Sequence, residues 1–432
     1  MRQPFKLNFK LPLIMGNNKL KPKYTWNYKL NYIEYYLANF RGKSVARTRS
    51  MSLTSVSALA ITACGGGSSG SDDGVKGFPD SYLAPKYDYI PPTERDPNFE
   101  ILKPIYTNPY WVASLEMDQW DAHISPMLVD FERLIHYSFP DKSPEYDTFG
   151  LTGWGPATEE MKIATLNILT KLEDILDITF DESNDPKATN VISVSTSNQA
   201  NTAGFSYFPN NFYEIGMDVF ISNVYSIPKF SSELTTNYDY EVLVHEIGHA
   251  IGLKHPFEAS GANTATLSTF EDNTRNTAMS YDEYTETFNG TLRPLDWMAL
   301  AKLYGVKSTY NSGNDTYNFS SLGGTFILDG SGDDTISAYA TSQDVTIDLR
   351  PGAHSHLGSK SSYITAANQL TISHGSDIEN VITGSGNDTV IGTDSDNIII
   401  TESGSDTIFA GGGADTIISG TGNDRIDLSE FV

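Results

Sequence analysis

The sequence predicts two folded parts, an α+β domain and then a parallel β-roll. Apolar residues recur at helical spacing from Thr158 onward, and runs of β-branched and aromatic residues follow at 190–195 and 217–222. After Gly305 helical periodicity stops and a nine-residue period replaces it. Mixed helices and strands indicate an α+β domain, and the repeat indicates stacked parallel strands. We therefore place a domain boundary at 305/306.

The expected helices of the first domain have recognisable ends. Thr158 is a candidate N-cap, with two glutamates in the turn that follows it. A second helix is expected over about 240–253, and a third over 295–304, where Gly305 would end it. The folded core should begin near Tyr110.

Charge is distributed unevenly along the 432 residues, which carry a formal net charge of -25. Residues 1–50 hold 11 of the 29 Lys and Arg and one of the 54 acidic residues, which leaves 18 basic and 53 acidic residues for 51–432. Such an acidic surface disfavours nucleic acid and suits divalent cations. We expect a monomer that acts on proteins or peptides and binds no nucleic acid.

The N-terminal region has the anatomy of a signal segment. A short apolar run at 51–63 follows basic residues and ends in small residues at Cys64, the only cysteine. The run is shorter than the ~20 apolar residues that a membrane span requires. Residues 61–64, ITAC, resemble the lipobox of bacterial lipoproteins, which implies a lipidated Cys64. We interpret 1–64 as a basic leader with a lipoprotein-type signal, and 65–109 as a flexible tether or pro-region.

The basic leader leaves two accounts open. Either the leader is unusually long, or translation begins nearer Val45 or Met51.

The motif HEIGHAIGLKHP at 245–256 contains three histidines at a spacing that suits a metal site. Residues four apart share one helix face, so His245 and His249 can bind one ion. Gly252 can adopt a positive φ and end the helix, so that His255 returns as a third ligand. Three protein ligands leave a fourth tetrahedral position for water, the arrangement of catalytic zinc.

The alternative is a surface helix with incidental histidines. A bare HExxH occurs by chance in roughly one sequence in a hundred of this length. The added glycine and third histidine lower that frequency by roughly three orders of magnitude. The spacing therefore favours a zinc site.

The extended motif resembles that of the metzincin peptidases, and Pro256 after the third histidine resembles the serralysin branch. The segment 277–281, TAMSY, is similar to the methionine turn of that family. The resemblance implies that Met279 lies beneath the metal. It also implies that Tyr281 ligates the resting zinc and stabilises the oxyanion. Segments 203–209 and 217–222 resemble the loop and strand that border the serralysin cleft, where a peptide could pair as an added strand.

These residues predict an extracellular or surface-tethered zinc endopeptidase. Zinc would lower the pKa of a bound water and polarise the scissile carbonyl. Glu246 would take the water's proton as general base and deliver it to the leaving amine. The competing hypothesis is a calcium-dependent surface or adhesion module whose peptidase domain is inactive.

The repeat places an acidic or amide residue every nine positions from Asp388 to Asp424, each followed two residues later by Val or Ile. This GGxGxDxUx pattern indicates a calcium-binding β-roll, in which turns offer carbonyl oxygens and carboxylates. The units that contain Asn397 and Asp406 lack expected glycines, so we assign no calcium there. The expected calcium-site residues are Gly330, Gly332, Asp334, Gly384, Gly386, Asp388, Gly411, Gly413, Asp415, Gly420, Gly422 and Asp424.

Two export signals conflict. The end of the chain, 427–432, resembles the acidic and then apolar ending that directs serralysins through type I secretion, whereas a cleaved lipoprotein signal at Cys64 belongs to another route. Both routes end outside the cytoplasm. We favour an outer-membrane or surface lipoprotein, with a secreted enzyme as the second choice.

Overall fold

The computed structural model describes segments of the chain between Ile61 and Ser429, which form two folded parts. For Ile61–Cys64 only the backbone is described. The part of the predicted leader before residue 61 and residues 65–107 of the tether predicted over 65–109 lie outside the described residues. The described residues are 61–64, 108–118, 128, 133–146, 151–183, 190–199, 201–210, 214–224, 238–284 and 290–429.

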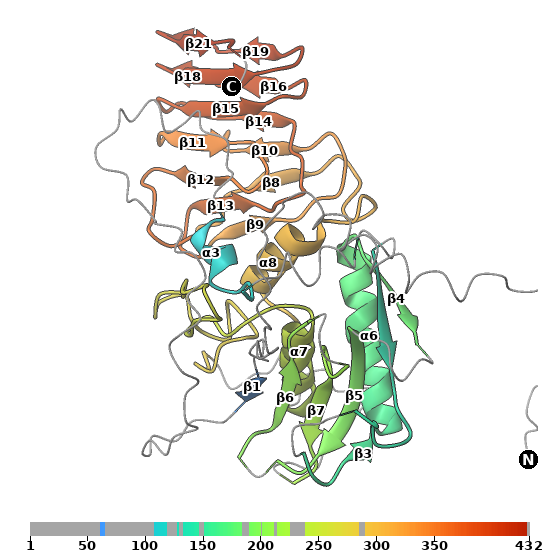
Figure 1. The fold of residues 1–432 in the computed structure, drawn as a ribbon. Coiled ribbons are helices and arrows are strands. Elements are labelled where there is room, and N and C mark those ends of the chain that lie inside the picture. Colours follow the sequence, from blue (N-terminus) through green and yellow to red (C-terminus); the bar gives the residue numbers. More distant parts are fainter. Residues whose placement is uncertain are drawn as a thin grey trace, which may run out of the picture. The chain divides into compact units, whose positions relative to one another are not determined.

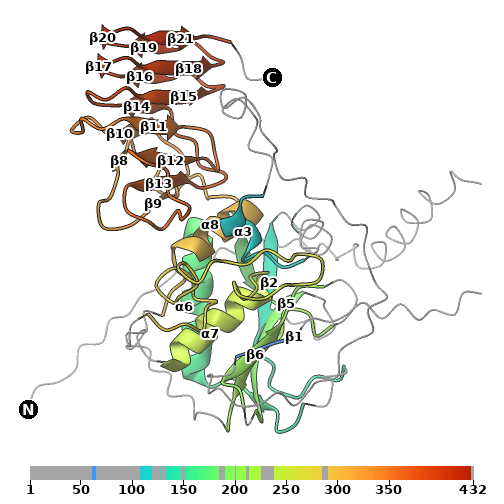
Figure 2. The ribbon, with the colours of Figure 1, turned by 90° about the vertical axis from the view of Figure 1, so that its left-hand side faces the viewer.

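The first part is a sheet with two long helices against one face (Figures 1 and 2). Its strand order is β1-β6-β7-β5-β2-β4, with β3 paired to β5. Neighbours among β4, β2, β5 and β7 run parallel, whereas β6 is antiparallel to β7. Both predicted strands are present, as β5 and β7. The bounds are β1 Ile61–Cys64, β2 Leu134–Ser138, β3 Gly155–Pro156, β4 Thr179–Glu182, β5 Val191–Ser197, β6 Gly204–Tyr207 and β7 Val219–Ser222.

Strand β6 has a neighbour on each side. It pairs with β7 on one side, and on the other the backbone of β1 pairs with it in antiparallel register, Ile61 opposite Tyr207 and Cys64 opposite Gly204. The edge at which the sequence predicts an added peptide strand is therefore already paired with another segment of this chain.

The three predicted helices are present, as α6 Glu159–Ile175, α7 Tyr238–Ala250 and α8 Pro294–Tyr304. The described residues also form a short helix that was not predicted, α3 Tyr110–Ala113. Thr158 caps α6, because its side chain accepts a hydrogen bond from the Met161 amide at 3.3 Å. Gly305 follows α8 with a φ of 77°. Helix α7 ends three residues earlier than the predicted Leu253, for a reason given with the site below.

The second part is a roll of two sheets, with strand orders β19-β16-β14-β10-β8 and β21-β18-β15-β11-β12-β13-β9 (Figure 1). A short pair, β17 with β20, lies beside them. The bounds are β8 Thr316–Asn318, β9 Thr325–Ile327, β10 Thr335–Ser337, β11 Val345–Asp348, β12 His354–Leu357, β13 Gln369–Ile372, β14 Asn380–Ile382, β15 Thr389–Thr393, β16 Ile398–Ile400, β17 Ser403–Gly404, β18 Thr407–Gly411, β19 Thr416–Ile418, β20 Thr421–Gly422 and β21 Arg425–Asp427.

Two nine-residue repeats make one coil of this roll. Val390 lies opposite Ile408, and Ile408 opposite Ile426, so equivalent strands of one sheet are 18 residues apart. The repeat residues Val390, Ile399 and Ile408 are fully buried between the sheets. Ile426 is 45% exposed, because no further coil covers it within the described residues.

The roll departs from the prediction in one respect. Strand β12 runs antiparallel to both β11 and β13. It lies in the stretch between Asp334 and Gly384, where the nine-residue pattern is interrupted. Without the repeated turns, this stretch forms a meander instead of a coil.

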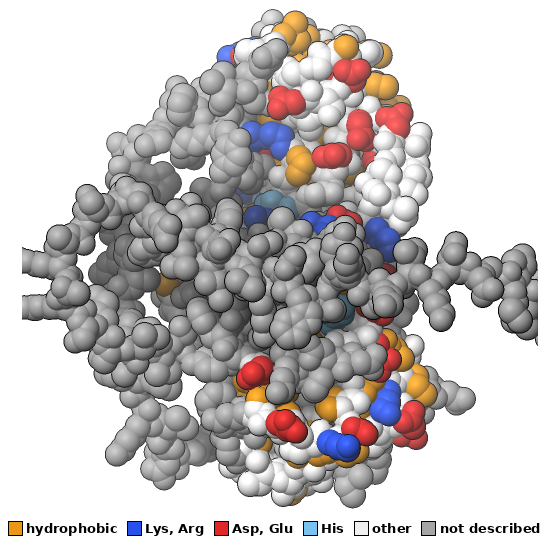
Figure 3. Space-filling view, turned by 45° about the vertical axis from the view of Figure 1, so that its right-hand side comes forward, with side chains coloured by type: hydrophobic (Ala, Val, Ile, Leu, Met, Phe, Trp, Pro, Cys, Tyr) orange, Lys and Arg blue, Asp and Glu red, His pale blue; other side chains and the backbone are white. Residues whose placement is uncertain are grey.

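In the parts of Figure 3 that are not covered by grey atoms, acidic side chains are visible in both the upper and the lower part of the molecule. Among the residues that the structure describes, no helix is both long and apolar enough to cross a membrane.

The cap of α6 can be tested directly. Thr158→Ala should lower the free energy of unfolding by about 1 kcal/mol, because the Met161 amide loses its acceptor. Thr170→Ala, at an exposed position within the same helix, is the matched control and should change stability little. Chemical denaturation measures both, and an equal effect of the two substitutions would contradict the cap.

Candidate functional site

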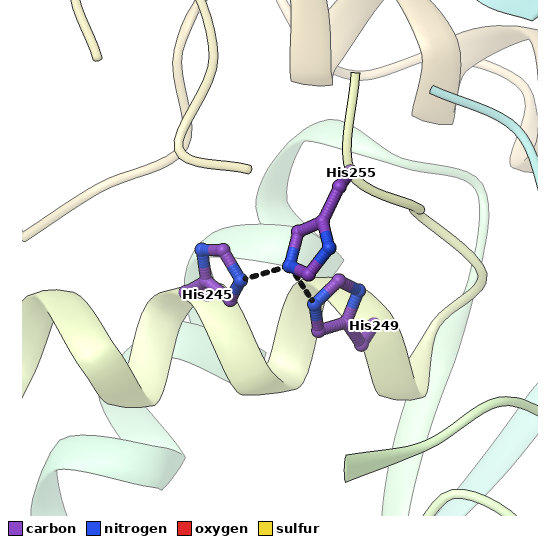
Figure 4. A group of neighbouring side chains, drawn as sticks. All are labelled: His245, His249 and His255. Carbon is purple, nitrogen blue, oxygen red and sulfur yellow. Dashed lines mark hydrogen bonds between the residues drawn. The ribbon is translucent and has the colours of Figure 1, made fainter. Parts of the chain in front are cut away.

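Three histidines meet at the end of α7 (Figure 4). His245 and His249 lie one turn apart on this helix, and His255 returns from the loop that follows it. The Nε2 atom of His255 is 3.2 Å from Nε2 of His245 and 3.1 Å from Nε2 of His249. A tetrahedral ion with Zn–N bonds of 2.0–2.1 Å needs nitrogens about 3.3 Å apart. The spacing of these atoms therefore fits zinc.

The end of α7 makes this convergence possible. Gly252 has a φ of 101°, and the amides of Gly252 and Leu253 donate to the carbonyls of His249 and Gly248. This is the Schellman arrangement, in which a residue with positive φ closes the helix and reverses the chain. Gly252 therefore ends the helix as predicted, and the last helical residue is Ala250.

Lys254 anchors the reversed chain. It is 1% exposed, its Nζ donates to the carbonyl oxygens of Ser114, Glu258 and Ala265 at 2.7–2.8 Å, and Nζ also lies 3.2 Å from the His255 carbonyl oxygen. Burial lowers the pKa of Lys254 to about 8. The ammonium group thus fixes both sides of the residue that supplies the third imidazole.

Each histidine ring is oriented through its other nitrogen. Nδ1 of His245 lies 2.7 Å from the Ala278 carbonyl oxygen, and Nδ1 of His249 lies 2.7 Å from that of Leu253. Nδ1 of His255 lies 2.5 Å from Oε1 of Glu258. These acceptors favour a proton on every Nδ1, which leaves the three Nε2 lone pairs free to bind a metal ion.

Burial keeps the rings neutral. His245, His249 and His255 are at most 5% exposed. Burial lowers the pKa of His245 to about 4 and that of His255 to about 2, and it holds the pKa of His249 well below the ordinary value of a histidine. Neutral imidazoles are the form that binds zinc, so the donor set suits the ion at neutral pH.

The other predicted residues surround this centre. Glu246 is fully buried, and its carbonyl oxygen accepts from the Ser206 hydroxyl of β6 at 2.8 Å. Tyr281 Oη lies 2.9 Å from Nε2 of His255. Met279 is fully buried under α7, where a Cβ added to Gly248 would lie 2.7 Å from its sulfur. The glycine therefore lets the methionine approach the helix.

The methionine turn is held by Asp296 of α8. Its carboxylate accepts from the Thr277 hydroxyl at 2.6 Å, the Ala278 amide at 2.7 Å and the Arg293 amide at 2.8 Å. Burial raises the pKa of Asp296 to about 6. Since the Ala278 carbonyl contacts His245, this carboxylate connects α8 to a metal-binding ring.

In the roll, the repeat aspartates share one arrangement. Oδ1 of Asp388 accepts from the Val345 amide, and Oδ1 of Asp406 accepts from the Asp388 amide. The Oδ2 atoms of Asp388, Asp406 and Asp334 are all buried, and none of them has a hydrogen-bond partner. A hard, oxygen-binding cation would satisfy these atoms, so the donor set fits calcium.

Asp406 resembles Asp388 although its unit lacks an expected glycine, because its Oδ1 also accepts from an amide and its buried Oδ2 also has no hydrogen-bond partner. Glu402 occupies the position of a glycine and adopts a φ of 57° there, so the turn forms despite the substitution. Asn397 is unlike both. Its side chain is engaged by the protein, since Oδ1 accepts from the Thr393 amide and Nδ2 donates to the Glu379 carbonyl.

Two acidic residues that sequence reasoning missed join Asp334. Carboxylate oxygens of Asp315, Asp329 and Asp334 lie within 4.8 Å of one another, and the last two are fully buried. Burial and the nearby charge of Asp334 raise the pKa of Asp329. The spacing Gly313-Asn-Asp315 is a short form of the repeat and was the available signal. Lys254 and Glu258 had no comparable signal, because their roles depend on the fold.

These features define a metallopeptidase domain joined to calcium-binding repeats, and comparison with known proteins agrees. Residues 179–289 match the reprolysin-like metallo-peptidase family M12B. Residues 375–408 and 391–426 match the RTX calcium-binding nonapeptide repeat. One segment of the chain is thus similar to a reprolysin-like peptidase domain, and another is similar to calcium-binding repeats.

Curated relatives are named serralysins or a related metallopeptidase. The chain is 31% identical over 301 residues to serralysin of Proteus mirabilis, which covers 60% of this chain and 59% of the relative. It is 29% identical over 275 residues to metallopeptidase AprA of Pseudomonas marginalis, with 56% of each covered. It is 30% identical over 217 residues to serralysin C of Dickeya chrysanthemi, with 44% and 43% covered. The chain therefore spans less than two thirds of the length of these relatives.

The contact between Glu258 and His255 predicts a role in metal affinity. Glu258→Gln should weaken zinc binding about 10- to 100-fold, because a neutral amide is a weaker acceptor for the Nδ1 proton. Glu283→Gln, at an exposed position, is the control. Competition with a chromophoric chelator measures the affinity, and unchanged binding would show that Glu258 does not orient the ring.

Proposed function

We propose that this protein is a zinc-dependent endopeptidase. The observation that carries the proposal is the convergence of three neutral imidazole Nε2 atoms beside a buried glutamate. When bound, zinc would supply an acidified water and a polarised carbonyl at that point. His245, His249 and His255 would hold the ion.

The remaining roles belong to the chain's own residues. Glu246 would accept the proton of the attacking water and pass it to the departing amine, first as base and then as acid. Tyr281 would ligate zinc at rest, then donate its hydroxyl hydrogen to the oxyanion. Its place near His255 and its 39% exposure support this, because the ring can move without disturbing the core. Gly252 and Met279 would shape the site without touching the reacting atoms.

An extended substrate would pair with the edge of β6, next to the segment that carries Glu246. Because β1 pairs with that edge in the structure, we propose that maturation at Cys64 frees it. Cleavage before Cys64, as the lipobox resemblance implies, would remove residues 61–63 of β1. Cys64 would then carry the lipid and become the new N-terminus.

A calcium-dependent adhesion module with an inactive peptidase domain is the second candidate. The extended roll and its acidic surface favour it. Glu246, the three histidines and the oriented Nδ1 atoms favour an active enzyme, because an inactive domain has no need for this arrangement.

We propose that calcium binds along the roll. The ligands would be the turn carbonyls and aspartates of the repeat units predicted above, with Asp406, Asp315 and Asp329 added. We also propose the domain limits 110–305 for the peptidase and 306–432 for the roll. Repeats of this class together with an acidic surface favour a place outside the cell, where calcium is abundant. A surface lipoprotein is our first choice and a secreted enzyme our second.

The base assignment predicts a separation of activity from metal binding. Glu246→Ala should reduce casein hydrolysis by several orders of magnitude while one equivalent of zinc remains bound. Glu160→Ala, at an exposed position in α6, is the control and should hydrolyse casein normally. A zinc chelator should abolish the activity of the control. Full activity in Glu246→Ala would refute the assignment, and an inactive wild type with zinc bound would favour the adhesion module.

Calcium should control the fold of the roll. Without calcium, mutual repulsion of buried carboxylates should leave this part largely unfolded, and calcium should restore β-structure in circular dichroism. Asp334→Asn should raise the calcium concentration required, since it removes a buried anionic ligand. Asp394→Asn, which is exposed, is the matched control and should leave that concentration unchanged. Identical spectra with and without calcium would contradict this.

A further inference from the structure

Glu271 joins three segments that are distant in sequence. Its Oε2 accepts from the Tyr110 hydroxyl of α3 at 2.7 Å. Its Oε1 accepts from the amide and the hydroxyl of Thr365, at 3.2 and 2.9 Å, in the roll segment between β12 and β13. Glu271 itself lies in the loop after His255 and is fully buried. The peptidase loop and the roll therefore share one buried carboxylate.

The segment around Thr365 is held by contacts with the rest of the roll and by contacts with the peptidase domain. The Thr365 carbonyl accepts from the Gly324 amide at 2.9 Å, just before β9. Ile364 is 2% exposed and packs in the hydrophobic core of the peptidase domain, and its amide donates to Tyr110 Oη at 3.1 Å. The Tyr363 ring stacks on Phe270, with centroids 4.7 Å apart. An ordered roll is thus required to complete this corner of the peptidase core.

On the other side, Glu271 belongs to the turn that leads into the methionine turn. The neighbouring Asp272 accepts from the Ser280 hydroxyl at 2.5 Å, and the Thr274 amide donates to the Asp282 carbonyl at 2.9 Å. These two bonds hold the residues on either side of Tyr281. A displacement of the turn around Glu271 would therefore move Tyr281 relative to His255.

We propose that Glu271 is a positioning residue, through which the calcium-ordered roll holds the segment that carries Met279 and Tyr281 against the metal site. Loss of order in the roll removes the Thr365 donors and Ile364, and it leaves a buried carboxylate short of partners. The inference rests on the proposed function only for the roles of Met279 and Tyr281. The coupling itself concerns folding and metal retention.

Hydrogen exchange in the full-length zinc-loaded chain tests the coupling as calcium is titrated. The reporters are four amides with hydrogen bonds inside the turn: Asp272, Asn273, Asn276 and Thr277. In the wild type, these amides and the roll should gain protection over the same calcium range. In Glu271→Gln and Thr365→Val, the roll should fold at the wild-type calcium midpoint. The four amides should nevertheless exchange about tenfold faster, and zinc should pass to a chelator about tenfold faster.

Thr416→Val, at an exposed position in β19, is the matched control for Thr365→Val and should behave as wild type. If Glu271→Gln fails to fold, Thr365→Val still decides, because it removes only a hydroxyl donor. Wild-type exchange and zinc release in a folded variant would overturn the proposal. A calcium midpoint that shifts in step with the exchange would also overturn it, because the effect would then be general destabilisation. Coupling without any peptide hydrolysis would support this proposal while contradicting the enzyme assignment.

Discussion

The metal site depends on where helix α7 stops. His255 is six residues beyond His249, and a continued helix would carry it about 9 Å along the axis and away from the other two rings. The positive φ of Gly252 reverses the chain, and the Gly252 carbonyl then accepts from the Met117 amide while the Lys254 amide donates to Leu115. The third imidazole is therefore placed by a backbone reversal that the neighbouring segment 115–117 secures.

Buried charges hold the irregular segments around this reversal. The Lys254 ammonium donates to three carbonyl oxygens at 2.7–2.8 Å, Asp296 accepts from the methionine turn, and the Arg293 guanidinium pairs with Glu241 of α7 at 2.6 Å. Removing one partner of a buried pair typically costs about 3–5 kcal/mol, because the remaining charge stays in the interior. These buried contacts give the irregular segments around the histidines a fixed geometry. A metal site requires such fixed positions of its ligands.

The sequence predicted what depends on periodicity and on fixed offsets. The capped helix after Thr158, the strands β5 and β7 and the roll of nine-residue repeats were predictable because their apolar residues recur regularly. The meeting of His245, His249 and His255 was predictable because helix geometry and a glycine stop determine it. The contacts of Glu258, Lys254 and Glu271 were not, because their partners lie in loops without a period or in other elements. The antiparallel β12 was also missed, since the repeat pattern is absent from that stretch.

The roll adds an electrostatic condition to this architecture. Each repeat aspartate satisfies one oxygen with an amide of a neighbouring coil, and in Asp334, Asp388 and Asp406 the other oxygen remains buried without a hydrogen-bond partner. Stacking coils therefore accumulates buried negative charge, which divalent cations neutralise and which opposes folding without them. Since Ile364 belongs to the core of the peptidase domain, that condition extends to the domain that holds the histidines. On the proposed coupling, the corner of the peptidase domain that Ile364 fills would be ordered where calcium is abundant. Where calcium is scarce, it would lack this contact with the roll.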